Sequence, residues 1–142
     1  MKVDGACLCG QVQYEAEVDL NRVAFCHCTD CQINSGCPMS WLVVAKENTF
    51  RLTSGKLTTY IKTAESGTKR ALEFCAECGT RILAKPVDGG PGHVTLRAGA
   101  IRQRDQLTPR AHVWARSAQS WVYDLSKLPT FDKVPGKRAI SR

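Results

Sequence analysis

Cys75-Ala76-Glu77-Cys78-Gly79 is the stretch that we expect to decide the fold of this chain. In a C-x-x-C-G pattern, two sulfurs face one point, backbone N–H groups aim at them, and the glycine takes a left-handed turn. Two sulfurs supply half of a tetrahedral zinc site. We expect the other half from Cys7-Leu8-Cys9-Gly10, where a strand would place both sulfurs on one face.

These two segments together predict a closed structural zinc site that ties the N-terminus to the middle of the chain. Its ligands would be Cys7, Cys9, Cys75 and Cys78. Disulfides are the alternative for all eight cysteines of the sequence. The C-x-x-C spacing and an N-terminus without an apolar signal region favour reduced thiols and a cytoplasmic protein.

A second cysteine cluster lies in Cys26-His27-Cys28-Thr29-Asp30-Cys31. Three sulfurs hold a metal ion and leave a fourth tetrahedral position open, which is the arrangement of a catalytic zinc site. Thiolate-rich sites select Zn, Cu(I) or iron–sulfur clusters, and the spacing here does not match a ferredoxin pattern. We therefore predict two zinc ions per chain, with Cys26, Cys28 and Cys31 holding the catalytic one.

Single residues near this cluster have competing interpretations. His27 would turn to the opposite face of a strand, so we expect it to support the ligands or lie at the surface rather than bind metal. Cys37 is a small buried residue, a redox partner or a fourth ligand, and we expect packing. His93 and His112 are expected in the core or in hydrogen bonds. The tryptophans are also expected in the core: Trp41, Trp114 and Trp121.

The hydrophobic pattern predicts a mostly antiparallel β fold. Alternation over 12–18 indicates a half-buried strand, 19–21 a turn, and 39–44 a buried strand. One short helical turn is expected over 29–35. Further short strands are expected at 49–52, 57–62, 69–74, 80–83, 93–98 and 109–114, with a loop at 88–92.

The composition bounds the class of protein. At 142 residues the chain is predicted to be one domain over 1–142, with a loosely held tail from about Val134. No apolar run is long enough to cross a membrane. The formal charge is +7, but the basic residues are scattered, so we expect no nucleic-acid partner. Such a charge balance suits a small acidic substrate.

Five motifs in order resemble the glutathione-dependent formaldehyde-activating family, also known as the centromere-protein-V type domain. They are G-x-C-x-C-G-x-V-x-Y (5–14), C-H-C-x-x-C (26–31), S-G-x-P (35–38), F-C-x-x-C-G-T (74–80) and L-P-x-F-D (128–132). The resemblance implies a zinc-binding antiparallel β-sandwich of the Mss-four-like type and the same two-zinc scheme. The chain departs from the common pattern at Gln32, where Arg is frequent, and at Cys37, where Ala is usual.

The resemblance implies a carbon–sulfur lyase that joins glutathione and formaldehyde as S-hydroxymethylglutathione. Its partners would be a small glutathione-like thiol and an aldehyde. The alternative is a zinc β domain that binds a protein or nucleic acid without catalysis. A third hypothesis, a protein like methionine sulfoxide reductase, needs a free cysteine on a late strand, but the last cysteine is Cys78.

Overall fold

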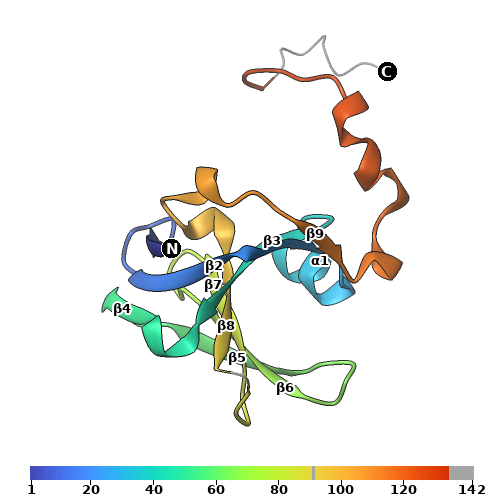
Figure 1. Cartoon of the computed structure of the whole chain (residues 1–142). Helices are drawn as coiled ribbons and strands as arrows, with labels where there is room; N and C mark the ends of the chain where they lie inside the picture. The colour runs from blue at the N-terminus through green and yellow to red at the C-terminus, as the bar shows by residue number, and fades with distance from the viewer. Residues whose placement is uncertain (91, 135–142) are drawn as a thin grey trace.

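The computed structural model describes residues 1–90 and 92–134, so the predicted tail beyond Val134 lies outside the described residues (Figure 1). The described part is mostly β, as the alternating patterns predicted. The strands are β1 (Lys2–Ala6), β2 (Gln13–Cys26), β3 (Ser40–Lys46), β4 (Arg51–Ser54), β5 (Thr58–Thr63), β6 (Lys69–Phe74), β7 (Arg81–Pro86), β8 (His93–Arg97) and β9 (Ala111–Val113). The helical segments are α1 (Thr29–Ser35) and the 3-10 turns η1 (Glu47–Thr49), η2 (Ala98–Ala100), η3 (Arg104–Gln106), η4 (Ala115–Ser117) and η5 (Ser120–Lys127).

The strands pair in the order β1-β2-β3-β8-β7-β6-β5, and β4 and β9 each pair with β2. All pairs are antiparallel except β2–β9, which is parallel. The predicted antiparallel architecture is therefore confirmed. Because each tight connection reverses the chain, the short turns that separate the strands favour this arrangement.

Strand β2 belongs to two groups of strands. Its first half pairs with β1 and β4, and its second half with β3 and β9. The register shifts between Val18 and Val23, where the Asn21 N–H donates to the Asp19 carboxylate at 2.9 Å. The turn predicted at 19–21 is thus wrong: an irregularity inside one long strand bends it from one group to the other.

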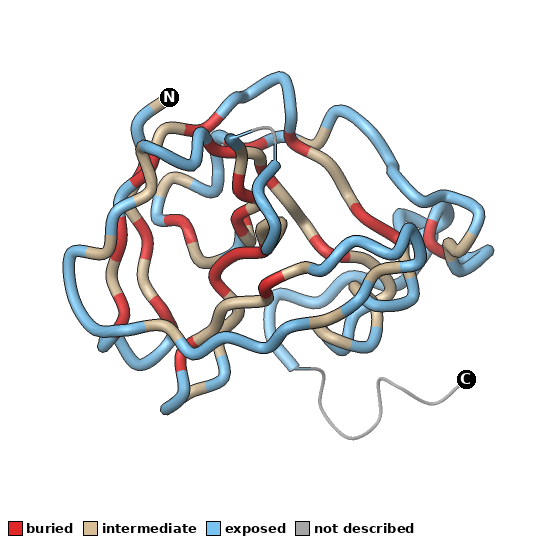
Figure 2. The backbone as a smooth tube through the Cα atoms, turned by 90° about the horizontal axis from the view of Figure 1, so that it is seen from below, coloured by how far each residue is buried: buried red, intermediate tan, exposed pale blue. Residues whose placement is uncertain are grey.

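The core lies on the inner faces of these strands (Figure 2). Its largest fully buried side chains include Tyr14, Ile82, Leu96, Ile101 and Leu107. Trp41 packs against this core as predicted, and its indole N–H donates to the Leu107 carbonyl at 3.0 Å. A half-buried tryptophan satisfies its polar N–H in this way.

The other two tryptophans contradict the prediction of core positions. Trp114 is 47% exposed and Trp121 is 50% exposed. Both follow the last sheet pairing, β2–β9, in a segment of 3-10 turns that leads away from the strands in Figure 1. In the part of the chain that the structure describes, no helix is both long and apolar enough to cross a membrane.

Gly5 should be intolerant of a side chain. It lies opposite Tyr14 in the β1–β2 ladder, and an added Cβ would overlap the Tyr14 ring and lie 2.6 Å from the Ala100 carbonyl. We expect Gly5→Ala to lower the free energy of unfolding by about 1–3 kcal/mol or more, as in other overpacked cores. Urea denaturation measures this. Gly99→Ala is the control, because a Cβ there meets nothing within 4 Å, and equal midpoints for the two variants would contradict the assignment.

Candidate metal centres and active site

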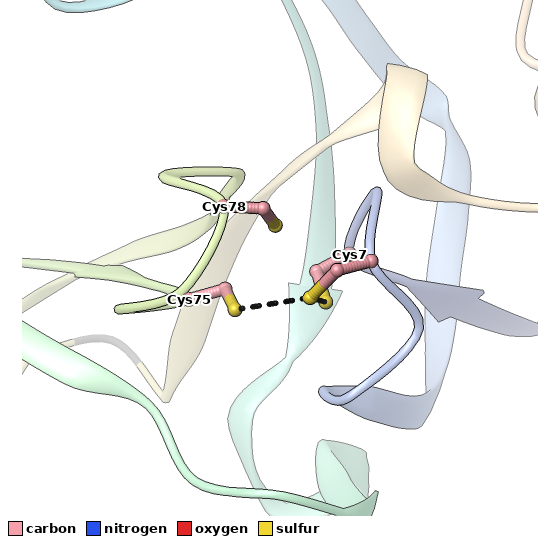
Figure 3. A group of neighbouring side chains, drawn as sticks. Cys7, Cys75 and Cys78 are labelled. Carbon is pink, nitrogen blue, oxygen red and sulfur yellow. Dashed lines mark hydrogen bonds between the residues drawn. The ribbon is translucent and has the colours of Figure 1, made fainter.

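Two cysteine loops bring four sulfurs together. The ligand atoms of Cys7, Cys9, Cys75 and Cys78 all lie within 4.8 Å of one another. Sulfur separations are 3.4 Å for Cys7–Cys9 and 3.8 Å for Cys9–Cys75. Figure 3 shows the sulfurs of Cys7, Cys75 and Cys78 converging from the two loops. Tetrahedral zinc with Zn–S bonds of about 2.3 Å places its sulfurs about 3.8 Å apart, so the donor set fits this ion.

The two loops are built alike. In each, a glycine N–H donates back to the carbonyl of the first cysteine: Gly10 to Cys7 at 3.0 Å, and Gly79 to Cys75 at 2.9 Å. Both glycines have positive φ, 78° and 72°, which a residue with a Cβ resists. The first loop is a turn that follows β1, so the prediction of a strand for Cys7 and Cys9 is wrong.

Thr80 connects the two loops. Its hydroxyl oxygen accepts a hydrogen bond from the Leu8 N–H at 3.0 Å and lies 3.1 Å from the Cys78 sulfur. The hydrogen bond from Thr80 lowers the pKa of Cys78 to about 5. The Val12 N–H donates to the Cys7 sulfur at 3.2 Å. These contacts favour thiolates, which are the form that binds metal.

The second predicted cluster also forms. The sulfurs of Cys26, Cys28 and Cys31 lie within 4.8 Å of one another. Cys26 ends β2, where it pairs with Ser40 of β3 and Val113 of β9. Cys28 caps α1, and its sulfur accepts a hydrogen bond from the Cys31 N–H at 3.3 Å. The helix predicted at 29–35 is confirmed, and it ends where Gly36 adopts φ 66°.

Positive charge lies beside this cluster. Arg97 of β8 places a guanidinium nitrogen 3.8 Å from the Cys31 sulfur. A hydrogen bond from Cys26, together with the charge of Arg97, lowers the pKa of Cys31 to about 5. The same hydrogen bond and burial raise the pKa of Cys26. The nearby guanidinium therefore favours the thiolate form of Cys31. Sequence reasoning did not find Arg97 as a site residue, because it lies 66 residues from Cys31 and reaches the site through the sheet.

The surface position that was one of the two expectations for His27 is excluded by its burial. His27 is fully buried, and its Nε2 lies 2.8 Å from Nδ1 of His112. Burial and the neighbouring His112 lower the pKa of His27. His112 is thereby confirmed as hydrogen-bonded. His27 is not among the metal-ligand groups of the described residues.

Gln32, one of the departures from the family pattern, connects α1 to the segment after β9. Its amide donates to the carbonyls of His27 and Ser117, each at 2.8 Å. Its side-chain oxygen accepts from the Gln119 amide at 3.0 Å. A neutral amide supplies both donors and an acceptor, whereas arginine has no acceptor. Gln32 therefore holds the Ser117 carbonyl and the Gln119 side chain beside the cluster.

Cys37 does not have the role that the sequence predicted. It is exposed, so the expectation of core packing is wrong. It also stands outside both cysteine groups found within residues 1–90 and 92–134. Gly36 turns the chain after α1, and this turn directs Cys37 to the surface.

The three-sulfur cluster opens onto a cavity of about 640 Å³. One wall is α1 and the segment around Trp114, and another is the end of β5 with the loop between β5 and β6. Two ion pairs join these walls, Lys62 to Asp30 and Glu65 to Arg116. The volume is in the usual range for a site that binds a small molecule. The sequence did not predict this cavity.

Trp114 is held in an unusual backbone conformation at the cavity. Its φ of 56° is left-handed, a region that non-glycine residues rarely adopt. The guanidinium of Arg116 lies 4.9 Å from its ring centroid. Such backbone strain is concentrated at binding and catalytic sites in proteins. The exposed aromatic side chain of Trp114 lines the cavity rather than the core.

These features define a class: mostly β proteins with two cysteine clusters able to hold metal, one of them at a cavity. Residues 2–117 match the family described as glutathione-dependent formaldehyde-activating enzyme, and the chain belongs to this family. A crystal structure of a Rhodobacter sphaeroides protein has a similar fold, with a TM-score of 0.61 at 20% identity. The match covers 78% of this chain and 99% of that one. No curated protein matches the sequence.

Removing one ligand of the four-sulfur cluster should unfold the protein. Binding free energy at structural zinc sites is folding free energy, on the order of 10 kcal/mol in small zinc modules. We therefore expect Cys78→Ser to lose one zinc ion per chain and its cooperative thermal transition. Metal analysis and thermal melting monitored by circular dichroism test this. A Cys78→Ser protein that melts like the wild type would contradict a structural role.

The three-sulfur cluster should be dispensable for folding, because adjacent residues form it and it closes no long loop. We expect Cys28→Ser to lose one zinc ion and to keep its β-rich circular dichroism and cooperative melting. Cys37→Ala is the matched control, since the exposed Cys37 lies outside both clusters. Unfolding of Cys28→Ser to the extent expected for Cys78→Ser would mean that both clusters are structural.

Proposed function

We infer that this protein is a carbon–sulfur lyase that forms and cleaves the adduct of a small thiol and an aldehyde. The observation that carries this proposal is a cluster of only three sulfurs at the wall of a cavity of about 640 Å³. Family membership supports it, because the family is described by an activity on formaldehyde that depends on glutathione. The reaction of this kind that the family description suggests is the condensation of glutathione with formaldehyde to S-hydroxymethylglutathione.

The two clusters would have different roles. Cys7, Cys9, Cys75 and Cys78 would hold a structural zinc ion, and Cys26, Cys28 and Cys31 a catalytic one. Zinc bound by the three sulfurs would supply a fourth coordination position for the substrate thiol and favour its thiolate form. The sulfur separations in the four-cysteine group are too long for disulfides, whose S–S bonds are about 2.05 Å. This supports a protein with reduced thiols, and we place it in the cytoplasm.

The reaction needs no oxidant or reductant. The substrate sulfur attacks the carbonyl carbon, and a carbon–sulfur bond forms while the carbonyl π pair moves to oxygen. That oxygen takes up a proton, which balances the proton lost by the thiol. The uncatalysed addition already proceeds, so holding the two reactants in place can supply much of the acceleration.

The chain's own residues would prepare the site for this addition. Arg97 lies close enough to Cys31 to stabilise negative charge on the sulfurs. Gln32 holds the Ser117 carbonyl and the Gln119 side chain, and Ser117 lines the cavity. The ion pairs Lys62–Asp30 and Glu65–Arg116 hold the β5–β6 loop against the opposite wall. Together these contacts would keep the walls of the cavity in position.

The alternative is a zinc β domain that binds a macromolecular partner. One observation favours it: exposed apolar side chains follow residue 117, where the family match ends. Among them are Trp121, Tyr123, Leu128 and Phe131. Exposed apolar clusters of this kind often mark interaction surfaces. Catalysis that depends on the three-sulfur cluster is expected of the lyase and not of the binding domain.

Exchange spectroscopy can test the lyase directly. With glutathione and ¹³C-formaldehyde at equilibrium, the zinc-loaded wild type should accelerate exchange between free formaldehyde and the adduct. We expect Cys28→Ser to return the exchange rate to the uncatalysed value, because it removes a ligand of the catalytic site. Cys37→Ala should leave the rate unchanged. A wild-type protein with two zinc ions and no acceleration, with glutathione or smaller thiols, would refute the proposal.

A further inference from the structure

The floor of the cavity is one face of the sheet formed by β3, β8, β7, β6 and β5. Leu72, Ala84 and Thr95 line the cavity and lie side by side in the register of β6, β7 and β8. Side chains alternate along a strand, so Arg70 of β6 and Arg97 of β8 point to the same face. Both also line the cavity.

Most of the charge that lines the cavity is already paired. Lys62 pairs with Asp30, and Glu65 pairs with Arg116. Arg97 lies beside the Cys31 sulfur. Arg70 is the remaining charged residue of the lining, and it has no ion-pair partner among residues 1–90 and 92–134. The cavity therefore contains one guanidinium whose charge no described side chain balances.

The register shows how far Arg70 lies from the sulfur cluster. In the β6–β7 pairing, Arg70 lies opposite Pro86. Two residues before Pro86 on β7, Ala84 lies opposite Thr95 of β8. Arg97 follows Thr95 by two residues on β8. Because β8 runs antiparallel to β7, Arg97 lies on the side of Ala84 that is away from Pro86. Four residues therefore separate the two arginine positions along the strands, about 13 Å of backbone. Leu72 and Ala84 lie between them and give this part of the floor an apolar surface.

We propose that Arg70 binds a carboxylate of the thiol substrate, at the end of the cavity away from the sulfur cluster. This inference rests on the proposed function and adds the residue that recognises the carboxylate of its thiol. The sulfur would reach the three cysteines, an apolar spacer would cross Leu72 and Ala84, and the carboxylate would meet Arg70. A guanidinium suits this task because its planar fork matches a carboxylate with two parallel hydrogen bonds.

Two probes of equal length isolate the carboxylate. Both 6-mercaptohexanoate and 6-mercaptohexanol carry a thiol on a six-carbon chain, and only the first has a negative charge. Isothermal titration of the zinc-loaded protein measures the Kd of each. We expect the wild type to bind the carboxylate about tenfold more tightly, as one charge-assisted hydrogen-bonded pair permits. This comparison uses only the wild-type protein, so it does not require any variant to fold.

Variants then assign the preference to Arg70. Arg70→Gln should bind both probes equally, with the Kd of 6-mercaptohexanol unchanged. Arg70→Lys should keep part of the preference, because it keeps the charge but not the fork. Lys69→Gln is the matched control, because Lys69 is the exposed neighbour on β6 and its side chain is directed to the other face. It should keep the full preference.

The outcomes separate the two proposals. Equal binding of both probes by the wild type, or a preference that survives Arg70→Gln, overturns the role of Arg70 and leaves the lyase intact. No binding of either thiol overturns both proposals, since the lyase requires a thiol at the cluster. A preference that is lost in Arg70→Gln and kept in Lys69→Gln supports the carboxylate site. Wild-type-like melting of Arg70→Gln would exclude a change caused by unfolding.

Discussion

The convergence of four cysteine sulfurs from two loops is the constraint on which the rest of the structure depends. Cys9 and Cys75 lie 66 residues apart in sequence, yet their sulfurs are 3.8 Å apart. This contact fixes the end of β1 against the β6–β7 connection. A metal ion bound by these sulfurs would crosslink the two loops, and a small domain gains much from a crosslink because its core alone buries limited apolar surface. The glycine turns and Thr80 then hold the loops in the geometry that suits a tetrahedral ion.

Strand β2 connects the first loop of the four-sulfur cluster to the three-sulfur cluster. Its first half leads out of the first cysteine loop and pairs with β1 and β4, and its second half lies between β3 and β9. Cys26 is the last residue of β2, and α1 begins three residues later with Cys28 as its cap. The cluster therefore lies where a well-supported strand meets a short helix. This placement gives the sulfurs a rigid base on one side and a cavity on the other.

The charged side chains around the cavity occupy two kinds of position. Ion pairs between side chains join the cavity walls, and Arg97 lies at the sulfur cluster. Arg81 lies behind this site with two buried nitrogens that have no hydrogen-bond partner in the described part of the chain. Burial and the adjacent Arg97 lower the pKa of Arg81, whereas Cys31 raises it. Two guanidinium groups near one cluster favour thiolates and negatively charged ligands at this end of the sheet.

The sequence by itself determined the cysteine clusters, α1 and most strands, because ligand spacing and side-chain alternation are local properties. Only the tertiary structure decided the cavity and its charged residues, since Arg70 and Arg97 meet the cysteines through strand pairing. The exposure of Trp114 and Cys37 likewise depends on where the chain leaves the sheet. Composition cannot predict such positions, because they are set by contacts between segments far apart in the chain.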